Sequence, residues 1–201
     1  MAQRSIFRDR RHAGEALADA LADIGNLDDV LVLGLPRGGV IVARAVADAL
    51  CAPLDVIVAR RLGVPGLPEV ALGAIAEGTN DVTIDAVAWY LGVPAAIINR
   101  IAQRERREIE RRVRRFRDGR PLPDVRGRVI VLVDDGLASG ATLRAAVQSR
   151  RQQGVSRIIV ACPVGSDAGI LEVAPWSTRS WCSPARSHSR WCQSGTRTSH
   201  R

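Results

Sequence analysis

The stretch Val129–Thr142 constrains the fold and the chemistry of this chain more than any other part of it. It begins with five apolar residues, mostly β-branched, which predict a buried strand. Two adjacent acids, Asp134 and Asp135, follow the strand, and a loop of small residues then leads into the helical run Leu143–Gln148. This order is typical of a phosphate site, because the N–H groups of such a loop and of the helix start stay accessible to an anion.

The loop and the acidic pair suit different parts of one ligand. We predict that a phosphate binds the loop residues Gly136, Leu137, Ala138, Ser139, Gly140, Ala141 and Thr142. The hydroxyls of Ser139 and Thr142 can add hydrogen-bond donors. Asp134 and Asp135 would repel a phosphate, so we expect them to accept hydrogen bonds from sugar hydroxyls or to help hold a divalent cation. A ribose 5-phosphate fits both halves.

This combination resembles the phosphoribosyl-pyrophosphate (PRPP) motif of the type I phosphoribosyltransferases. That motif has a hydrophobic strand, two acids, a short spacer, a small hydroxylated residue, Gly, one more residue and Thr, and Val129–Thr142 shows the same order. The resemblance implies an enzyme that transfers the pentosyl group of PRPP to a nitrogenous base or another small acceptor, with Mg²⁺ as cofactor and pyrophosphate as product. It also implies a homodimer. An ordinary capped strand-to-helix turn is the alternative.

A second predicted strand, Val30–Leu35, also ends in a glycine-bearing loop, Pro36–Gly39. Gly38 and Gly39 would let the backbone approach an anion closely, and Arg37 adds guanidinium donors suited to phosphate oxygens. The glycine spacing fits neither the dinucleotide fingerprint nor a Walker loop. In the resembled family a loop at this place holds the pyrophosphate of PRPP, which implies a catalytic role for Arg37 together with the two acids.

A third region begins where Arg60 and Arg61 close the predicted strand Leu54–Ala59. One of these arginines is expected to meet the pyrophosphate or the base. The segment Gly63–Glu69 is rich in Gly and Pro, and we interpret it as a mobile lid. Members of the resembled family close such a loop over PRPP, which keeps water from hydrolysing the reactive ribosyl centre. A surface loop with solvated arginines is the alternative.

The rest of the chain predicts alternating helices and strands. Further helices are expected over Gly14–Ile24, Val40–Leu50 and Pro94–Arg117, and further strands over Leu72–Ala76, Val82–Ile84 and Arg157–Cys162. Such alternation predicts an α/β fold of three layers, with a mainly parallel central sheet flanked by helices. Ligands are then expected beyond the carboxyl ends of the strands.

The long helix predicted over Pro94–Arg117 carries an apolar stripe together with nine Arg and three Glu. Two interpretations stay open. The helix could pack on the sheet with a solvated charged face, or Arg104–Arg117 could contact RNA or DNA in a non-catalytic protein that senses PRPP. Glu108 and Arg112 are placed for an i,i+4 ion pair, which favours the packed helix. Nucleic acid is therefore not the expected partner.

The positive charge of the chain lies largely in its last residues. All 29 basic residues are Arg, and residues 1–174 hold 24 of them against 21 acids, whereas residues 175–201 hold five Arg and no acid. The chain lacks an apolar run long enough to cross a membrane and an apolar signal-peptide core, so we expect a cytoplasmic protein. Cys51 and Cys162 lie in apolar neighbourhoods and are expected to be buried, reduced thiols.

The hydrophobic periodicity stops near Pro175. We therefore expect a phosphoribosyltransferase-like domain over residues 1–174 and a disordered tail over residues 175–201. Our hypothesis is that the tail is translated out of the ancestral reading frame and replaces the closing part of the fold, which leaves open whether the enzyme is active.

Ala138 narrows the choice of acceptor base. In the resembled 6-oxopurine salvage enzymes the third residue after the acidic pair is an acid that contacts the purine, and here it is Ala138. Hypoxanthine and guanine are therefore disfavoured, while a pyrimidine, adenine or another acceptor stays open.

Overall fold

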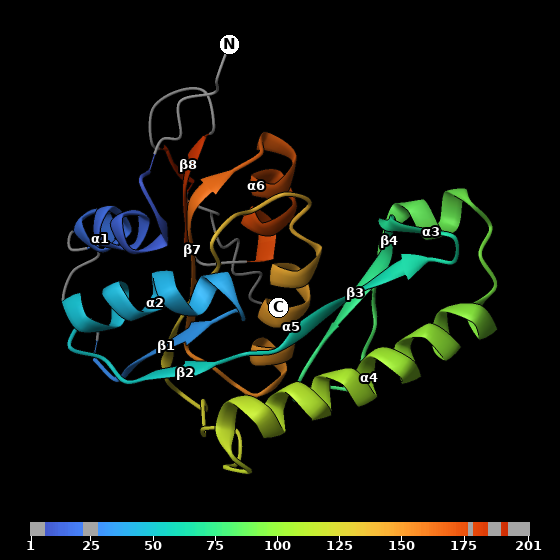
Figure 1. The fold of residues 1–201 in the computed structure, drawn as a ribbon, viewed down its shortest axis with the longest axis horizontal. Helices are drawn as coiled ribbons and strands as arrows, with labels where there is room; N and C mark the ends of the chain where they lie inside the picture. Colours follow the sequence, from blue (N-terminus) through green and yellow to red (C-terminus); the bar gives the residue numbers. More distant parts are fainter. Residues whose placement is uncertain (1–6, 22–27, 177–178, 185–189, 193–201) are drawn as a thin grey trace, which may run out of the picture.

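The centre of the fold is a six-stranded sheet (Figure 1), seen in a computed structural model that describes residues 7–21, 28–176, 179–184 and 190–192. Its strand order is β2-β1-β6-β7-β8-β9. The strands are β1 Val30–Gly34, β2 Leu54–Val56, β6 Val129–Val133, β7 Arg157–Gly165, β8 Arg179–Pro184 and β9 Arg190–Cys192. Neighbours from β2 to β8 are parallel, and β9 is antiparallel to β8.

Helices cover both faces of this sheet. Helices α1 Arg10–Leu21 and α2 Gly38–Ala49 lie on one face, and α5 Ala141–Gln152, α6 Asp167–Val173 and the 3₁₀ turn η2 Ala174–Trp176 lie on the other (Figure 1). Successive side chains of a strand point to opposite faces. In β6, Val131 and Val133 therefore pack under α1 and α2, whereas Ile130 and Leu132 pack under α5. The predicted three-layer α/β fold with a mainly parallel sheet is confirmed.

A second, antiparallel sheet stands apart from the first (Figure 1). It contains β3 Ala59–Val64, β4 Leu67–Ala76 and β5 Thr83–Ile84, and together with α3 Ala86–Tyr90 and α4 Ala95–Arg117 it forms what we call the lobe. The single strand predicted over Leu54–Ala59 is wrong. Ile57 N still donates to Gly34 of the main sheet, but Val58 exchanges hydrogen bonds with Glu77, so the chain changes sheets between these two residues.

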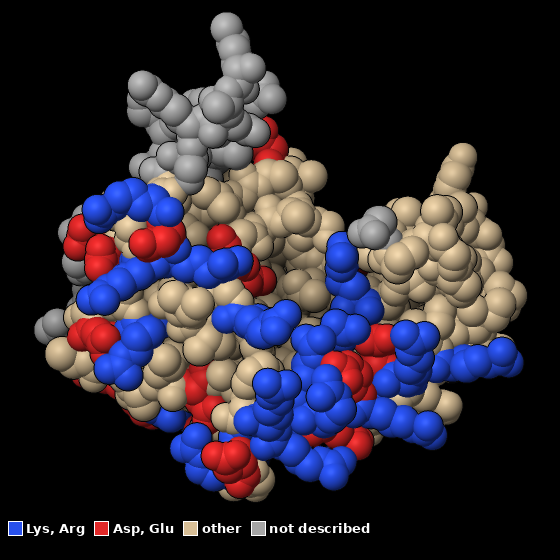
Figure 2. All heavy atoms as spheres, in the orientation of Figure 1, with Lys and Arg blue, Asp and Glu red and all other residues tan. Residues whose placement is uncertain are grey.

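Helix α4 packs its apolar stripe on β3 and β4 and turns most of its charges outward, although Glu105 and Arg117 are buried. Ile98 and Ile109 are buried against β3 and β4, and Glu108 pairs with Arg112 at 2.7 Å, as predicted. Figure 2 shows arginines gathered over this part of the molecule with acidic side chains between them. The helix ends at Asp118, whose φ of 48° lies in the left-handed region.

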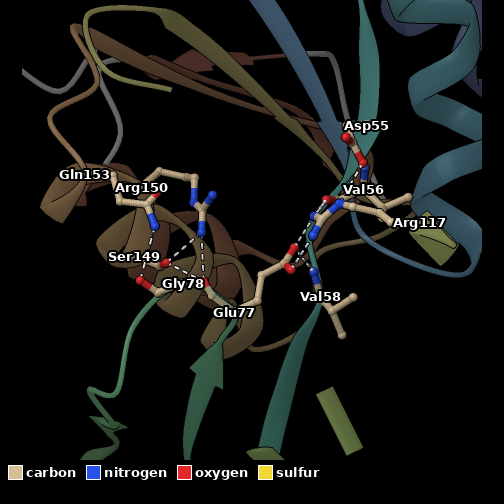
Figure 3. Close-up of polar contacts among 9 residues, drawn as sticks. All are labelled: Asp55, Val56, Val58, Glu77, Gly78, Arg117, Ser149, Arg150 and Gln153. Carbon is tan, nitrogen blue, oxygen red and sulfur yellow. Dashed lines mark hydrogen bonds and ion pairs between the residues drawn. The ribbon is translucent and has the colours of Figure 1, made fainter. Parts of the chain in front are cut away.

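A buried ion-pair network fastens the lobe to the main sheet (Figure 3). Arg117, at the end of α4, is 1% exposed and donates to both carboxylate oxygens of Glu77, at 2.8 and 2.6 Å, and to Asp55 of β2 at 3.0 Å. From α5, Ser149 and Arg150 donate to the Glu77 carbonyl. Charges in a protein interior are retained only when they are paired in this way. The network therefore holds the lobe beside the carboxyl edge of the main sheet.

Other predicted elements shift at their ends. Helix α1 begins at Arg10, earlier than the predicted Gly14, and the predicted end at Ile24 lies outside the described residues. Cys162 is buried as expected, but the predicted burial of Cys51 is wrong, because this free thiol follows α2 on the surface and is exposed. Within the described residues, no helix is long and apolar enough to span a membrane.

The segment for which disorder is predicted, residues 175–201, contributes the two strands β8 and β9 at one edge of the sheet. The rest of the segment beyond Trp176 lies outside the described residues. The boundary at residue 174, the disordered tail and the frame-shifted origin stay predictions.

Candidate active site

Two loops meet at the carboxyl edge of the central sheet. Strands β1 and β6 are paired in parallel with Gly34 opposite Val133, so the chain leaves both strands at the same edge. The Leu35 N–H donates a 2.8 Å hydrogen bond to the Val133 carbonyl and extends the contact by one residue. The predicted pyrophosphate loop, residues 36–39, and the loop at residues 134–142 therefore start side by side.

Gly38 and Gly39 are in direct contact with the acidic pair. A Cβ atom on Gly39 would lie 2.8 Å from the Val133 oxygen and from the Asp134 Cα, and one on Gly38 would lie 1.8 Å from Oδ2 of Asp135. A side chain at either position would collide with these atoms. The two sequence motifs thus form one site, and the acidic pair in its present position leaves no room for a side chain at Gly38 or Gly39.

The two carboxyl groups have different surroundings. Burial raises the pKa of Asp134 to about 7; the Asp135 N–H, which donates a 2.8 Å hydrogen bond to Oδ1, lowers this pKa, and the charge of Asp135 raises it. Asp135 is more open, with a side chain 32% exposed, and its Oδ2 accepts from Nε of Arg10 at 2.7 Å. The site therefore combines one carboxyl group that titrates near neutral pH with one that is paired to a cation.

Residues 136–142 form a loop that opens into α5. Leu137 is buried and its N–H donates to the Val164 carbonyl at 2.9 Å, whereas the two residues that follow it are exposed. Gly140 is the N-cap of α5 and has a φ of 78°, a left-handed conformation that favours glycine. Because glycine offers no side-chain oxygen, no side-chain cap occupies the first N–H groups of α5. An anion can accept from these groups.

Helix α6 supports this loop from behind. The Ser166 N–H donates to the Leu137 carbonyl at 2.8 Å, and the Ser166 hydroxyl donates to the Ala138 carbonyl. A Cβ atom on Gly169 would lie 2.5 Å from the same Ala138 oxygen, so the first turn of α6 lies directly against the loop. The position of the predicted phosphate loop is thus fixed by contacts with α6.

Two of the three predicted arginines, Arg60 and Arg61, border a cavity of about 640 Å³. It is lined by Pro36 of the first loop, Arg60 and Arg61 of β3, Arg104 and Arg112 of α4, and Thr142 of α5. Arg60 donates to Glu105 of α4 at 2.8 Å, so its charge is already paired, whereas Arg61 is exposed. Arg37 is exposed at the N-cap of α2. The structure therefore places Arg60 and Arg61 at the same cavity as Pro36 and Thr142, whereas Arg37 is not among the residues that line it, and Arg60 is already paired with Glu105.

The segment predicted as a lid, residues 63–69, is the tip of a β-hairpin. Val64 of β3 pairs with Leu67 of β4, and Pro65 and Gly66 make the turn, with Gly66 at a φ of 83°. The hairpin pairing extends further toward the tip than the sequence indicates, because Gly and Pro in the segment suggest a loop. Closure of this hairpin over a ligand stays a prediction.

Arg10 belongs to the site although no sequence pattern predicts it. Its guanidinium pairs with Asp135, which is 125 positions away in the chain. The only local signal is Asp9, an acid directly before an amphipathic run, which is typical of a helix N-cap. That signal marks the observed start of α1, which is earlier than the predicted start at Gly14, but it does not indicate which loop the helix reaches.

A comparison with models of known protein families agrees with the arrangement of the two loops. The model of the phosphoribosyl transferase domain family matches residues 5–193. The chain belongs to the phosphoribosyl transferase family. The resemblance based on Val129–Thr142 and Pro36–Gly39 is confirmed by this match.

One solved structure agrees in fold, and two curated proteins are similar in sequence. The crystal structure of TT1426 from Thermus thermophilus is 45% identical, with a TM-score of 0.69 over 83% of this chain and 79% of that chain. A Mycobacterium tuberculosis protein whose name describes it as a phosphoribosyl transferase is 44% identical over 177 residues. The bifunctional protein PyrR of Streptomyces coelicolor is 31% identical over 132 residues, which are 66% of this chain and half of PyrR.

The match to the mycobacterial protein covers 88% of this chain but only 40% of that protein. More than half of its length thus has no counterpart here. The activity of the whole protein is therefore not transferred to this chain.

Proposed function

We propose that this phosphoribosyl transferase family member transfers the ribosyl 5-phosphate group of PRPP to a nitrogen nucleophile and releases pyrophosphate. The observation that carries the proposal is the contact between the Gly38–Gly39 backbone and the Asp134–Asp135 pair at the ends of β1 and β6. An anion-binding loop beside two sugar-binding acids suits a ribose that carries phosphate groups at both ends. The 5-phosphate is assigned to residues 136–142 and the pyrophosphate to residues 36–39.

In this proposal the arginines stabilise the departing pyrophosphate. As the bond at C1′ breaks, negative charge grows on the leaving group, and guanidinium groups placed there beforehand lower the barrier. Arg37 and Arg61 are exposed, whereas Arg60 shares its charge with Glu105. Asp134 and Asp135 orient the ribose through its hydroxyls, and the 5-phosphate loop fixes the reacting carbon by remote binding.

Asp134 and Asp135 fit a magnesium ion that is shared with PRPP. Mg²⁺ prefers oxygen ligands and is usually held by one or two carboxylates together with water and phosphate oxygens. Among the described residues no cluster of three or more His, Cys, Asp or Glu side chains is arranged to hold a metal, so PRPP would have to supply most of the ligands. When bound, the ion would neutralise charge on the pyrophosphate.

The class of acceptor is inferred from Ala138, which stands where an acid contacts the purine in the 6-oxopurine enzymes. This residue is exposed on the phosphate loop and brings no acid to contact a 6-oxopurine, so we propose a pyrimidine, adenine or another nitrogenous acceptor. The alternative of a PRPP sensor that binds nucleic acid has less support, because Glu108 on α4 pairs with both Arg111 and Arg112. A cytoplasmic homodimer stays part of the proposal.

The test is pyrophosphate release from PRPP and Mg²⁺ with a panel of purine, pyrimidine and other nitrogenous acceptors. We expect release with at least one acceptor, and at least a tenfold loss of PRPP affinity in Asp134→Asn and Asp135→Asn. Asp118→Asn is the matched control, because Asp118 is exposed at the end of α4 and Asn also tolerates its left-handed conformation. PRPP binding without release from any acceptor would favour the sensor, and unchanged affinity in both site variants would remove the assignment.

A further inference from the structure

We propose that Arg10 of α1 is a pyrophosphate-binding residue that bridges Asp135 and the pyrophosphate of PRPP; this inference rests on the proposed function. Only Nε of Arg10 contacts Asp135, at 2.7 Å. The two terminal nitrogens of this guanidinium, with four N–H donors, have no partner among the described residues. These donors are thus available to a further anion while the pair with Asp135 persists.

The position of Arg10 points to pyrophosphate rather than to the 5-phosphate. A Cβ atom on Gly38 would lie 2.6 Å from Nε of Arg10, so the guanidinium lies directly over the predicted pyrophosphate loop. An ionised Asp135 alone would repel a pyrophosphate bound at Gly38. A guanidinium between them removes this repulsion and supplies planar, paired donors that match phosphate oxygens.

The start of α1 is built to hold Arg10 in this place. Oδ1 of Asp9 accepts a 2.8 Å hydrogen bond from the His12 N–H and caps the helix, so Arg10 is its first residue. Further along, a Cβ atom on Gly14 would lie 2.8 Å from the Val42 carbonyl of α2, which shows how closely the two helices pack. Since α2 begins at the pyrophosphate loop, this packing fixes Arg10 relative to that loop.

The ion pair itself contributes little to stability. The Arg10 side chain is 57% exposed, and ion pairs between exposed side chains are typically weak because water screens them. Removing the guanidinium is therefore expected to leave the fold intact, so a change in ligand affinity can be attributed to the lost contact with the ligand rather than to unfolding.

The experiment compares Arg10→Gln with Arg11→Gln in equilibrium binding of Mg²⁺-PRPP and of ribose 5-phosphate. Arg11 is the matched control, because its side chain is 84% exposed and pairs with Glu15 on α1 itself. We expect Arg10→Gln to weaken PRPP binding by about 10- to 100-fold, the range for one or two charge-assisted hydrogen bonds. Ribose 5-phosphate has no pyrophosphate, so its affinity should change less than twofold. Arg11→Gln should bind both ligands as the unmodified protein does.

The outcomes separate this inference from the proposed function. If Arg10→Gln binds PRPP normally, or loses both ligands equally, Arg10 is not a pyrophosphate residue, while PRPP binding by the unmodified chain still supports the proposed function. If the unmodified chain binds ribose 5-phosphate but not PRPP, both proposals are overturned. Arg10→Lys adds a check on geometry, since an ammonium keeps the charge but not the planar fork, and it should recover only part of the PRPP affinity.

Discussion

The backbone of Gly38 lies so close to Asp135 that a Cβ atom would be 1.8 Å from the carboxylate oxygen Oδ2. This contact joins two motifs that are almost one hundred residues apart in the chain. It also separates two roles of glycine in the first loop, because the neighbours of Gly38 are side-chain atoms, whereas the nearest neighbours of Gly39 are backbone atoms. Substitutions at the two positions should therefore fail in different ways.

Gly38→Ala should damage ligand binding more than stability. The new methyl group would push aside the Asp135 carboxylate and the Arg10 guanidinium, both of which can move. We expect at least a tenfold loss of PRPP affinity, measured by calorimetry, and a change in the free energy of unfolding below about 1 kcal/mol. Normal PRPP affinity in this variant would show that the Gly38–Asp135 contact is not part of the binding site.

Gly39→Ala should lower stability. Its Cβ would lie 2.8 Å from the Val133 carbonyl oxygen and from the Asp134 Cα, and backbone inside a sheet cannot move aside easily. Overpacking of this kind costs about 1–3 kcal/mol, which urea unfolding can measure. Gly136→Ala is the control, because the nearest atom to its added Cβ is 3.5 Å away, an ordinary contact. Equal stability of the two variants would contradict the packing seen at Gly39.

Much of the fold follows from local patterns. The apolar runs at Val30 and Val129, each followed by glycine or acid, predict strands and loops that the structure shows, because these signals need only neighbouring residues. Pairing over long distances leaves no such signal. The pair of Arg10 with Asp135 and the change of sheets near Ile57 both depend on which elements meet in space. Sequence patterns therefore indicate the two loops of the site but not the helix that completes it.

Short elements also escape prediction for a physical reason. Helix α3, Ala86–Tyr90, has five residues and cannot show a helical period. Helix α6 has a readable signal, since Ser166 caps it by accepting from the Gly169 N–H at 3.0 Å. The composition of the chain changes soon after, near Pro175, and this change makes the short helix at Asp167–Val173 hard to predict from the Ser166 cap.

Arg117→Ala should be strongly destabilising. It would leave Glu77 and Asp55 without their cation in a buried network (Figure 3), and breaking such a pair typically costs about 3–5 kcal/mol. Chemical denaturation should show this loss. Arg115→Ala, two positions earlier on the exposed face of α4, is the matched control and should change stability by less than about 0.5 kcal/mol. A small effect of Arg117→Ala would mean that the network does not hold the lobe.

Asp134→Asn should stabilise the protein at alkaline pH while it weakens PRPP binding at least tenfold. Asp134 titrates near pH 7 in the folded chain and near pH 4 in the unfolded chain, so the folded chain binds more protons between these values. The free energy of unfolding therefore falls as the pH rises from about 4 to 7. Asn stays neutral and can still accept from the Asp135 N–H, so the variant should gain roughly 2–4 kcal/mol at pH 8 and almost nothing at pH 4. Urea unfolding in metal-free buffer at both values measures this, and an equal difference at both would contradict the buried carboxyl group.

Arg60→Gln and Arg61→Gln in β3 should have different effects, because the first should lower stability and the second should lower PRPP affinity. Arg60 is held by Glu105, whose side chain is only 10% exposed, so its loss leaves this nearly buried acid with only the longer 3.7 Å ion pair to Arg104 and should cost about 1–2 kcal/mol of stability. Arg61 is exposed and lines the same cavity as Pro36, so its loss should leave stability unchanged but weaken PRPP binding about tenfold. Each variant serves as the control for the other, with urea unfolding and PRPP calorimetry as the two measurements. Normal PRPP affinity in Arg61→Gln together with weak binding in Arg60→Gln would reverse the assignment, and would mean that Arg60 exchanges Glu105 for the pyrophosphate when the hairpin closes.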